Sequence, residues 1–280
     1  MRHLNRLLVV ASLSAACGGP EAGSVAQPAA DVLIVLHPYF RDLRTVRVGL
    51  DRDTLTLLLD TGGGATLITP TVAARLGCRP FGRDVASRMD GERVVFQRCD
   101  SLTVDLAGWK RRLAPVGVFD VNALLPSELP RLDGVLALDV FDENVLTIDW
   151  PARRLTVHAA STSAAALAAN GIPLRAATGD NGRTLTVLAE VGSRRGALWL
   201  LIDSGNLRGT LIDAHIPRES LLVFASDSTV PLRVGPRAPY SDSAHVGDFI
   251  IDGALGTTFL ERGPVALDLR RLTPGVRTKP

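Results

Sequence analysis

The chain has 280 residues, of which 46% are hydrophobic and 21% are charged, so it can bury one or two cores and is not expected to be disordered. Its 31 basic and 29 acidic residues are dispersed, with only short basic clusters such as residues 110–112. Because nucleic-acid binding needs a basic face or stripe, this charge pattern argues against a nucleic-acid partner.

The N-terminal segment has the pattern of a signal peptide. Arg2 and Arg6 precede an apolar stretch, residues 7–16, that is too short to cross a bilayer as a helix. Residues 13–17 (LSAAC) resemble a bacterial lipobox, in which Cys17 is lipidated after cleavage. Ser14 stands where that pattern prefers a larger apolar residue, and a plain signal peptide cut nearby is the alternative.

The lipobox predicts an exported protein, lipid-anchored to a bacterial membrane and facing the periplasm or the cell surface. Residues 1–17 are then the signal peptide with its lipobox, and residues 18–30, rich in Gly, Ala and Pro, are a flexible tether. No later segment reaches membrane-spanning length, so the membrane is contacted through the N-terminal lipid alone.

The remaining cysteines, Cys78 and Cys99, lie outside any CxxC pattern, and export allows them to form a disulfide. The alternative is two free buried cysteines. The five histidines show no short ligand spacing with each other or with a cysteine, so we expect no metal site.

An internal repeat is the most informative feature. Residues 45–62 and 185–205 each contain an alternating segment, a charged turn and an apolar run, a pattern that predicts a β-hairpin. The first ends in Asp60-Thr61-Gly62 and the second in Asp203-Ser204-Gly205, and a Thr-Leu-Ile triplet follows each.

The repeat continues in the same order in both halves. Residues 133–137 (DGVLA) match residues 252–256 (DGALG), and residues 147–149 match residues 266–268. The two Asp-Ser/Thr-Gly motifs are 143 residues apart (203 minus 60), and the two Asp-Gly motifs are 119 residues apart (252 minus 133). The segment between the two kinds of motif is therefore longer in the first half. We expect a duplicated unit: a first lobe, residues 31–158, a linker, residues 159–171, and a second lobe, residues 172–280.

These motifs carry a resemblance to the aspartic peptidase superfamily, of the retropepsin or pepsin kind, over most of residues 45–272. The resemblance implies a mainly β protein: two pseudo-symmetric retropepsin-like β-barrel lobes in one chain, with few short helices. It also implies a hydrolase that cleaves a peptide or protein substrate without a cofactor, and we expect a monomer. Assembly of lobes from two chains is the alternative.

The resemblance assigns roles to the two repeated motifs. Asp60 and Asp203 form the catalytic pair, since two close carboxylates can share one proton, one acting as base and the other as acid. Thr61 and Ser204 brace the two turns through their hydroxyls, while Gly62 and Gly205 allow the backbone to approach closely. The expected site therefore consists of paired turns: Asp60, Thr61, Gly62, Asp203, Ser204, Gly205 and Asn206.

Asn206 follows the second motif where the first half has Gly63. An amide side chain there can donate to the carboxylate, so we expect Asp203 to carry more of the negative charge. Ala137 stands where the second half has Gly256, which predicts tighter or shifted packing beneath the first turn. The candidate flap, residues 82–98, has an Asp90-Gly91 turn signal and lacks the tyrosine of pepsin flaps.

Two functions remain at this stage. The first is an active aspartic endopeptidase that cuts an extended peptide between the lobes. The second is a catalytically inactive lipoprotein that binds peptide or protein, with the Asp-Ser/Thr-Gly segments kept only as turns.

Overall fold

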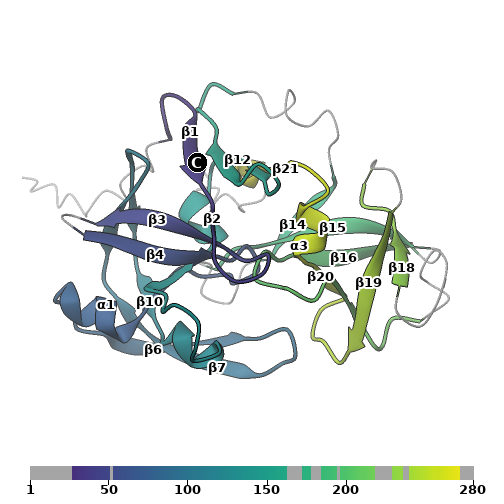
Figure 1. The fold of residues 1–280 in the computed structure, drawn as a ribbon, viewed down its shortest axis with the longest axis horizontal. Helices are drawn as coiled ribbons and strands as arrows, with labels where there is room; N and C mark the ends of the chain where they lie inside the picture. The colour runs from purple at the N-terminus through teal and green to yellow at the C-terminus, as the bar shows by residue number, and fades with distance from the viewer. Residues whose placement is uncertain are drawn as a thin grey trace, which may run out of the picture.

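The computed structural model describes residues 27–50, 53–162, 172–177, 184–193, 196–217, 229–235 and 240–271. The signal peptide, Cys17 and most of the expected linker lie outside these residues. The described chain is mainly β (Figure 1). Its helical elements are short: α1 (Pro70–Arg75), α3 (Thr257–Leu260) and the 3-10 turns η1 (Val121–Leu124), η2 (Leu138–Phe141) and η5 (Leu269–Arg271). None of the described helices is long and apolar enough to span a membrane.

The first repeat folds into a ten-stranded sheet with the order β6-β7-β10-β5-β11-β4-β3-β8-β9, in which β2 also pairs with β3. The expected hairpin is present, as β3 and β4 pair antiparallel. The strands are β2 (His37–Pro38), β3 (Arg44–Leu50), β4 (Asp53–Leu59), β5 (Leu67–Ile68), β6 (Phe81–Ser87), β7 (Arg93–Cys99), β8 (Leu102–Leu106), β9 (Trp109–Leu113), β10 (Val116–Val118) and β11 (Gly134–Leu136).

The second repeat folds into a seven-stranded sheet with the order β14-β15-β16-β20-β17-β19-β18. Its hairpin, β15 with β16, corresponds to β3 with β4. The strands are β14 (Leu174–Ala177), β15 (Thr186–Ser193), β16 (Gly196–Ile202), β17 (Thr210–Asp213), β18 (Thr229–Leu232), β19 (Tyr240–Gly247) and β20 (Gly253–Leu255).

The Asp-Gly motifs explain how each sheet folds beneath its turn. In the first lobe β11 runs parallel to β4 and antiparallel to β5, and β20 pairs in the same way with β16 and β17. A Cβ atom on Gly134 would collide with the carbonyl oxygen of Leu67, and one on Gly253 with that of Leu211. Glycine is therefore required at both positions, because the backbones of neighbouring strands approach too closely for a side chain.

The preceding aspartates complete this crossing. Asp133 accepts a hydrogen bond from the backbone N–H of Thr56, and Asp252 accepts one from that of Trp199, each at 2.9 Å. These carboxylates satisfy backbone groups at the edge of a buried strand, which explains their recurrence without any catalytic role.

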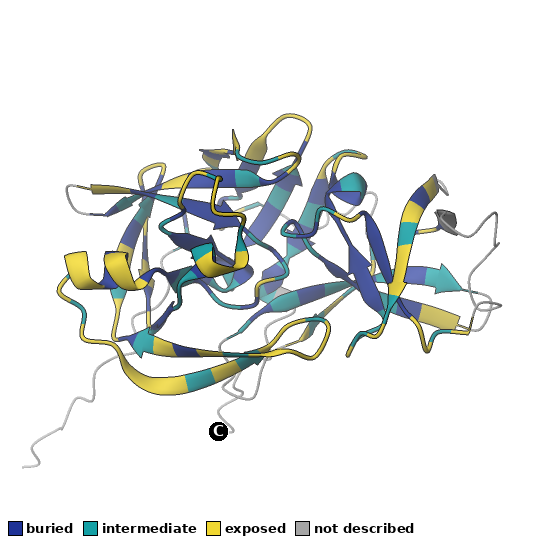
Figure 2. Ribbon diagram, turned by 60° about the horizontal axis from the view of Figure 1, so that its bottom comes forward, coloured by how far each residue is buried: buried dark blue, intermediate teal, exposed yellow. Residues whose placement is uncertain are grey.

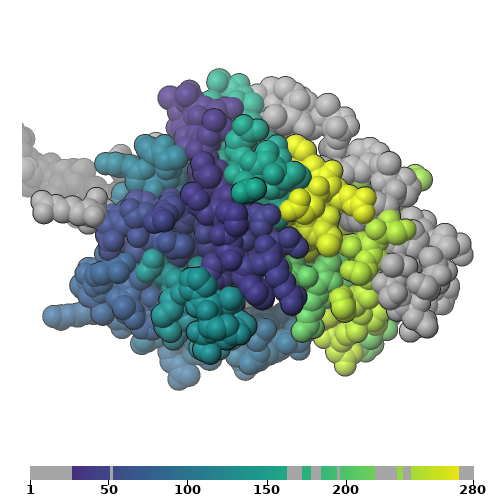
Figure 3. All heavy atoms as spheres, viewed as in Figure 1, coloured from purple at the N-terminus to yellow at the C-terminus, as the bar shows by residue number. Residues whose placement is uncertain are grey.

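A third sheet joins the two halves. It has the order β1-β13-β12-β21, from β1 (Val32–Val35), β12 (Val145–Asp149), β13 (Arg154–Val157) and β21 (Val265–Asp268). The equivalent strands of the two halves, β12 and β21, pair with each other, with Leu146 opposite Leu267. The two repeats are therefore joined along this sheet. In the space-filling view the C-terminal residues lie against both the N-terminal and the middle parts of the chain (Figure 3).

A continuous hydrophobic core fills both lobes (Figure 2). Its largest fully buried side chains include Trp150 and Phe141 from the first half and Phe259 from the second. Burial of each large apolar side chain stabilises the fold by roughly 1.5–3 kcal/mol, which is why the alternating strand pattern was a sound guide to the architecture. The expected mainly β, two-lobed fold with few short helices is what the structure has.

The longer middle of the first half consists of additional hairpins. Between β5 and β10 the first lobe has β6–β7 and β8–β9, whereas the described chain between β17 and β19 has only β18. Cys78 and Cys99 form a disulfide, with their Cα atoms 5.9 Å apart, that ties the segment after α1 to the end of β7. It closes a loop of 21 residues, a length for which loop entropy stabilises a fold by about 3 kcal/mol.

Candidate active site

The two Asp-Ser/Thr-Gly turns interlock through their hydroxyls. Thr61 donates from Oγ1 to the carbonyl of Ile202 at 2.7 Å, and Ser204 donates from Oγ to the carbonyl of Leu59 at 2.8 Å. Each hydroxyl also accepts the backbone N–H of the other residue, at 3.0 Å in both directions. Both residues are completely buried. The hydroxyls brace the turns as expected, and they do so across the lobes, so neither turn is held by its own half alone.

These hydrogen bonds between the turns bring the two candidate catalytic residues, Asp60 and Asp203, into contact. The side chains of Asp60 and Asp203 hydrogen-bond to each other. Gly62 donates its N–H to Asp60 Oδ1 at 3.0 Å, and Gly205 donates its N–H to Asp203 Oδ1 at 2.9 Å. A Cβ atom on Gly62 would lie 2.6 Å from Cγ of Asp203, and one on Gly205 would lie 2.9 Å from Cγ of Asp60. The glycines are therefore needed because each faces the carboxyl group of the opposite turn.

Burial makes the two carboxyl groups act as one titrating unit. It raises the pKa of Asp60, and it raises the pKa of Asp203 well above its ordinary value, with the charge of Asp60 as the next cause. Both residues nevertheless keep part of their surface exposed, unlike the buried residues that follow them. The two carboxyl groups are therefore coupled in their titration, and both keep part of their surface open to water.

Asn206 has a different role from the one expected. Its Nδ2 donates to the carbonyl of Gly209 at 3.0 Å, and its Oδ1 accepts the N–H of Arg208 at 2.8 Å. The backbone N–H of Asn206 lowers the pKa of Asp203, as that of Gly63 does for Asp60, and each of these N–H groups also donates to the backbone carbonyl of its own aspartate at 3.3 Å. The expectation that this side chain makes Asp203 the more negative partner is wrong, because the amide is used within its own turn.

The packing beneath the first turn is shifted relative to that beneath the second, which is one of the two outcomes that Ala137 predicted. In the second lobe a Cβ atom on Gly256 would lie 2.5 Å from the carbonyl oxygen of Gly209, so glycine is required there. In the first lobe the N–H of Ala137 bonds to Thr66 Oγ1 at 3.1 Å, and the residue is fully buried. The first turn is one residue shorter, six positions from Asp60 to Thr66 against seven from Asp203 to Thr210, so different atoms lie beneath it.

Two carboxylates, one partly buried and one buried, brace the ends of the turns, and the sequence pattern did not reveal them. Asp139 accepts the hydroxyl of Thr66 at 2.6 Å and its backbone N–H at 2.8 Å. Asp242 accepts the hydroxyls of Thr210 and Thr258, both at 2.7 Å. Asp139 was detectable as a lone acid in an apolar run, whereas Asp242 lies in a polar stretch without any such signal.

The expected flap is the hairpin β6–β7. Its turn closes where the Asp90-Gly91 signal predicted, since Arg88 N–H bonds to the Glu92 carbonyl at 2.7 Å and Gly91 has φ +83°. Its tip contacts the second lobe, because the N–H of Ile250 donates to the carbonyl of Met89 at 2.9 Å.

One group of possible metal ligands exists in the described chain, outside the paired turns. Asp213, His215 and Asp248 each offer a ligand atom, all within 4.8 Å of one another. His215 and Asp248 are exposed, and Asp213 already accepts the N–H groups of Phe249 and His215. These are the contacts of a turn after β17, so we derive no metal chemistry from them.

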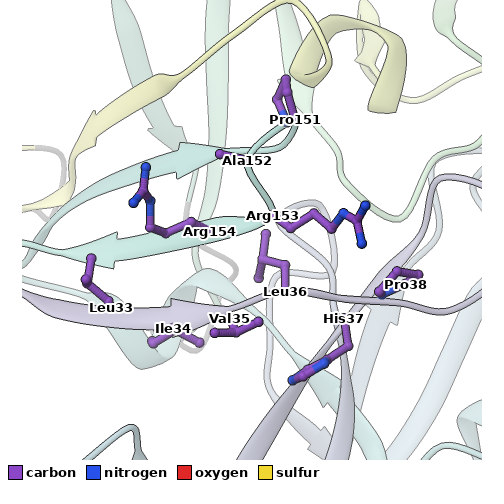
Figure 4. A pocket seen from close by; sticks show the side chains of 10 residues that line it. All are labelled: Leu33, Ile34, Val35, Leu36, His37, Pro38, Pro151, Ala152, Arg153 and Arg154. Carbon is purple, nitrogen blue, oxygen red and sulfur yellow. The ribbon is translucent and has the colours of Figure 1, made fainter.

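An open surface depression of about 580 Å³ lies on the joining sheet, and no residue of the paired turns lines it (Figure 4). β1 and the following residues line one side and residues 151–154 line the other. Among its lining residues Arg153 and Arg154 are the charged ones, His37 is also present, and there is no carboxylate. It therefore lacks the groups that hydrolysis by paired acids requires.

No family model and no curated protein matches the sequence. Among solved structures the chain is similar to conglutin gamma, a basic 7S globulin from lupine seeds, with a TM-score of 0.52 and 10% identity over 88% of this chain and 94% of that one. It is also similar to basic 7S globulin from soybean, with a TM-score of 0.51 and 11% identity over the same shares. These neighbours have a pepsin-like fold and are described as globulins, so the likeness bears on the fold alone.

Proposed function

We propose that this protein is an aspartic endopeptidase that hydrolyses peptide bonds with a water molecule activated by Asp60 and Asp203. The observation that supports it most directly is the contact of the two carboxyl groups, held by reciprocal hydrogen bonds between Thr61 and Ser204. Burial of two neighbouring carboxyl groups costs free energy. A turn kept only for folding would not need a carboxyl group from the other lobe at hydrogen-bond distance from its own.

The chemistry follows from the shared proton. The ionised carboxylate takes a proton from water while the water oxygen attacks the peptide carbonyl carbon, and the protonated carboxyl gives its proton to the carbonyl oxygen. In the collapse of the tetrahedral species the second carboxylate takes a proton back from a hydroxyl of the diol, the C–N bond breaks, and the amine leaves with the proton that the first carboxylate received. The pair returns to a singly protonated state. Backbone N–H groups of Gly62 and Gly205 orient the carboxylates throughout.

The proposed location is a bacterial membrane, to which the exported protein is lipid-anchored and from which it faces the periplasm or the cell surface. The lipobox-like residues 13–17 would supply the lipid at Cys17, and a disulfide between Cys78 and Cys99 suits an oxidising compartment. The substrate would then be a peptide or protein segment near the membrane, and one chain already carries both halves of the site.

A lipoprotein that binds peptide without cleaving it is the second candidate. It is supported by the fact that a fold does not settle a function, and that Asp-Ser/Thr-Gly segments also serve as tight turns after strands. The two candidates share a peptide-binding site and differ in whether the paired acids act on the bound chain.

Substitution of either aspartate tests the proposal. We expect Asp60→Asn and Asp203→Asn each to lower the cleavage of an unfolded protein by about 10²–10⁴-fold, because each removes either the base or the acid. Purified full-length protein in detergent is assayed from acidic to neutral pH, with fragments identified by mass spectrometry. Both pKa values are raised by burial, so cleavage should extend to a higher pH than two ordinary aspartates would allow.

Asp149→Asn and Asp268→Asn are the matched controls. These aspartates also repeat between the halves, but they lie on the joining sheet and not in the turns. Cleavage should persist in both controls. Absence of cleavage by the wild-type protein at every pH would sink the peptidase and leave the binding protein.

A further inference from the structure

The chain is bonded to the first lobe a short way after the proposed lipidation site. Gln27 donates its side-chain N–H to the carbonyl of Glu143 at 2.7 Å, and the carbonyl of the buried Pro28 accepts the N–H of Ala160 at 3.1 Å. Cys17 lies ten positions before Gln27 (27 minus 17). A chain of that length spans about 36 Å at most when extended, and about 16–19 Å as a coil. A lipid on Cys17 therefore keeps the chain that enters β1 close to the bilayer.

The strand that follows presents apolar side chains to solvent. β1 is an edge strand of the joining sheet, since it pairs only with β13 among the described residues. Side chains alternate along it: Ile34 and Leu36 are buried, whereas Leu33 and Val35 are 55% and 60% exposed. Single exposed apolar residues are ordinary, but two on one face of an edge strand form an apolar strip that favours contact with another apolar surface.

Two arginines border this strip. Arg154 lies directly opposite Val35 in the pairing of β1 with β13, so the two side chains share one face of the sheet. The side chain of Arg154 is 51% exposed and has the carboxylate of Asp149 at 3.8 Å. Figure 4 shows Leu33 and Val35 along one side of the depression, with Arg153 and Arg154 along the other. The face therefore combines exposed aliphatic groups with positive charge.

Arg153 occupies a backbone position that arginine rarely takes. It closes the turn between β12 and β13, where its N–H bonds to the carbonyl of Trp150 at 3.0 Å, and its φ is +52°. Glycine is favoured in this left-handed region, because a Cβ atom is strained there. Arg153 is exposed, and no carboxylate lines the depression beside it. A cation kept at a strained position without such a neighbour indicates an anionic partner outside the fold.

We propose that this docking face, formed by Leu33, Val35, Arg153 and Arg154, binds the surface of the bilayer that holds the lipid anchor and prefers anionic lipids. The aliphatic side chains enter the boundary between headgroups and acyl chains, and the arginines bind lipid phosphates. No residue of the paired turns lines the depression, so the docking face is separate from the candidate active site. The inference rests on the proposed lipid anchor and adds an orientation that an anchor alone does not give.

Contact with the bilayer is measured by quenching with lipids brominated in their acyl chains. Full-length Val35→Trp and Val246→Trp are reconstituted in vesicles of phosphatidylethanolamine and phosphatidylglycerol. Val246 is the matched control, because it is 59% exposed and lies on β19 of the second lobe. The wild-type signal of Trp109, Trp150 and Trp199 is subtracted. We expect Val35→Trp to lose roughly half or more of its added fluorescence, because the side chain lies about 5–10 Å into the boundary region. Val246→Trp should lose none.

The preference for anionic lipids is tested in the Val35→Trp background. Arg153→Gln should lower the ratio of docked to undocked protein by roughly 5-fold in the anionic vesicles, the effect of one arginine near such a surface. It should have no effect in vesicles of phosphatidylcholine alone. Arg83→Gln is the matched control, since Arg83 is an exposed arginine on β6, which Figure 1 shows on the opposite side of the first lobe from β1. Equal effects of the two substitutions overturn the anionic preference.

Equal quenching of Val35→Trp and Val246→Trp overturns the docking face. So does a dimer of the wild-type protein, seen by sedimentation in detergent, that Leu33→Asp dissociates, because the strip is then covered by a second copy of the chain. Mass spectrometry of the N-terminal fragment measures lipidation of Cys17 separately. Quenching of Val35→Trp in protein without the lipid keeps the docking face and removes the anchor, lipid without quenching does the reverse, and the absence of both overturns both.

Discussion

The two Asp-Ser/Thr-Gly turns are equal in their centre and different at their ends. Asp60 and Asp203 have the same backbone donors, and Thr61 and Ser204 make the same pair of bonds across the lobes. Beyond them the first turn is braced by Asp139, from the segment after β11, and the second by Asp242, from β19.

The difference shows which parts of a duplicated site are interchangeable. The hydrogen bonds of Thr61 and Ser204 join one lobe to the other, so a substitution at either residue affects both turns. The hydrogen bonds of Asp139 and Asp242 lie within one lobe each, so a substitution there affects one turn. Asp139 in one half corresponds by position to Thr258 in the other, and Thr258 itself bonds to Asp242. Both turns therefore have a carboxylate at their end, but it comes from a different element in each lobe.

The largest expected effect concerns a feature that both lobes share. Gly134→Ala and Gly253→Ala each place a methyl group against a backbone carbonyl oxygen, and backbone cannot move aside as a flexible side chain can. We expect each to lower the free energy of unfolding by about 3 kcal/mol, the upper part of the usual range for overpacking. Urea denaturation measures both values.

Gly192→Ala is the control for a glycine in a strand, since the nearest atom to an added Cβ lies 3.8 Å away. It should be close to neutral or stabilising. If only one of Gly134→Ala and Gly253→Ala lowers the free energy of unfolding, the close approach of the strands is not equivalent in the two lobes.

The second expected effect separates the two braces. Burial raises the pKa of Asp139 from 3.8 to about 6, against the opposing hydrogen bonds from Thr66. The native protein therefore retains a proton that the unfolded chain releases, and the stability contributed by this group falls as the pH rises from about 4 to 6. The asparagine side chain of the Asp139→Asn variant does not titrate, so its stability lacks this pH dependence. Relative to the variant, the wild type should lose on the order of 3 kcal/mol of unfolding free energy between about pH 4 and 6.

Urea denaturation at a series of pH values measures the difference between the two proteins. Asp248→Asn, at an exposed position, controls for the loss of one surface carboxylate. A wild-type-minus-variant difference that is flat between pH 4 and 6 would show that Asp139 is ionised as readily as an ordinary aspartate.

The smallest expected effect concerns Asn206. Asn206→Ala removes the bonds to Arg208 N–H and to the Gly209 carbonyl and keeps the backbone N–H that reaches Asp203. We expect a loss of about 1–2 kcal/mol in unfolding free energy and no displacement of the acid limb of the cleavage profile. Cleavage rates across the acidic range provide the measurement, and an acid limb moved by ~0.5 pH unit or more would restore the amide as a partner of the Asp203 carboxylate.

Much of the site was predictable because its signals are local. An apolar run followed by Asp-Ser/Thr-Gly identifies a strand and a turn within about ten residues, and the repetition of that pattern predicted two lobes with paired aspartates. The Asp-Gly segments were likewise visible, although their reason, a backbone approach that excludes Cβ, is a property of the folded sheet.

The sequence by itself determined the strands, the duplicated order and the place of Asp60 and Asp203 at equivalent turns. Only the tertiary structure decided what surrounds them: Asp139 and Asp242 under the turns, the amide of Asn206 bonded to its own loop, and Met89 seated beside Ile250. The physical reason is separation along the chain. A strand pattern depends on neighbours two residues apart, whereas Met89 and Ile250 meet across 161 positions (250 minus 89), through contacts that no local pattern encodes.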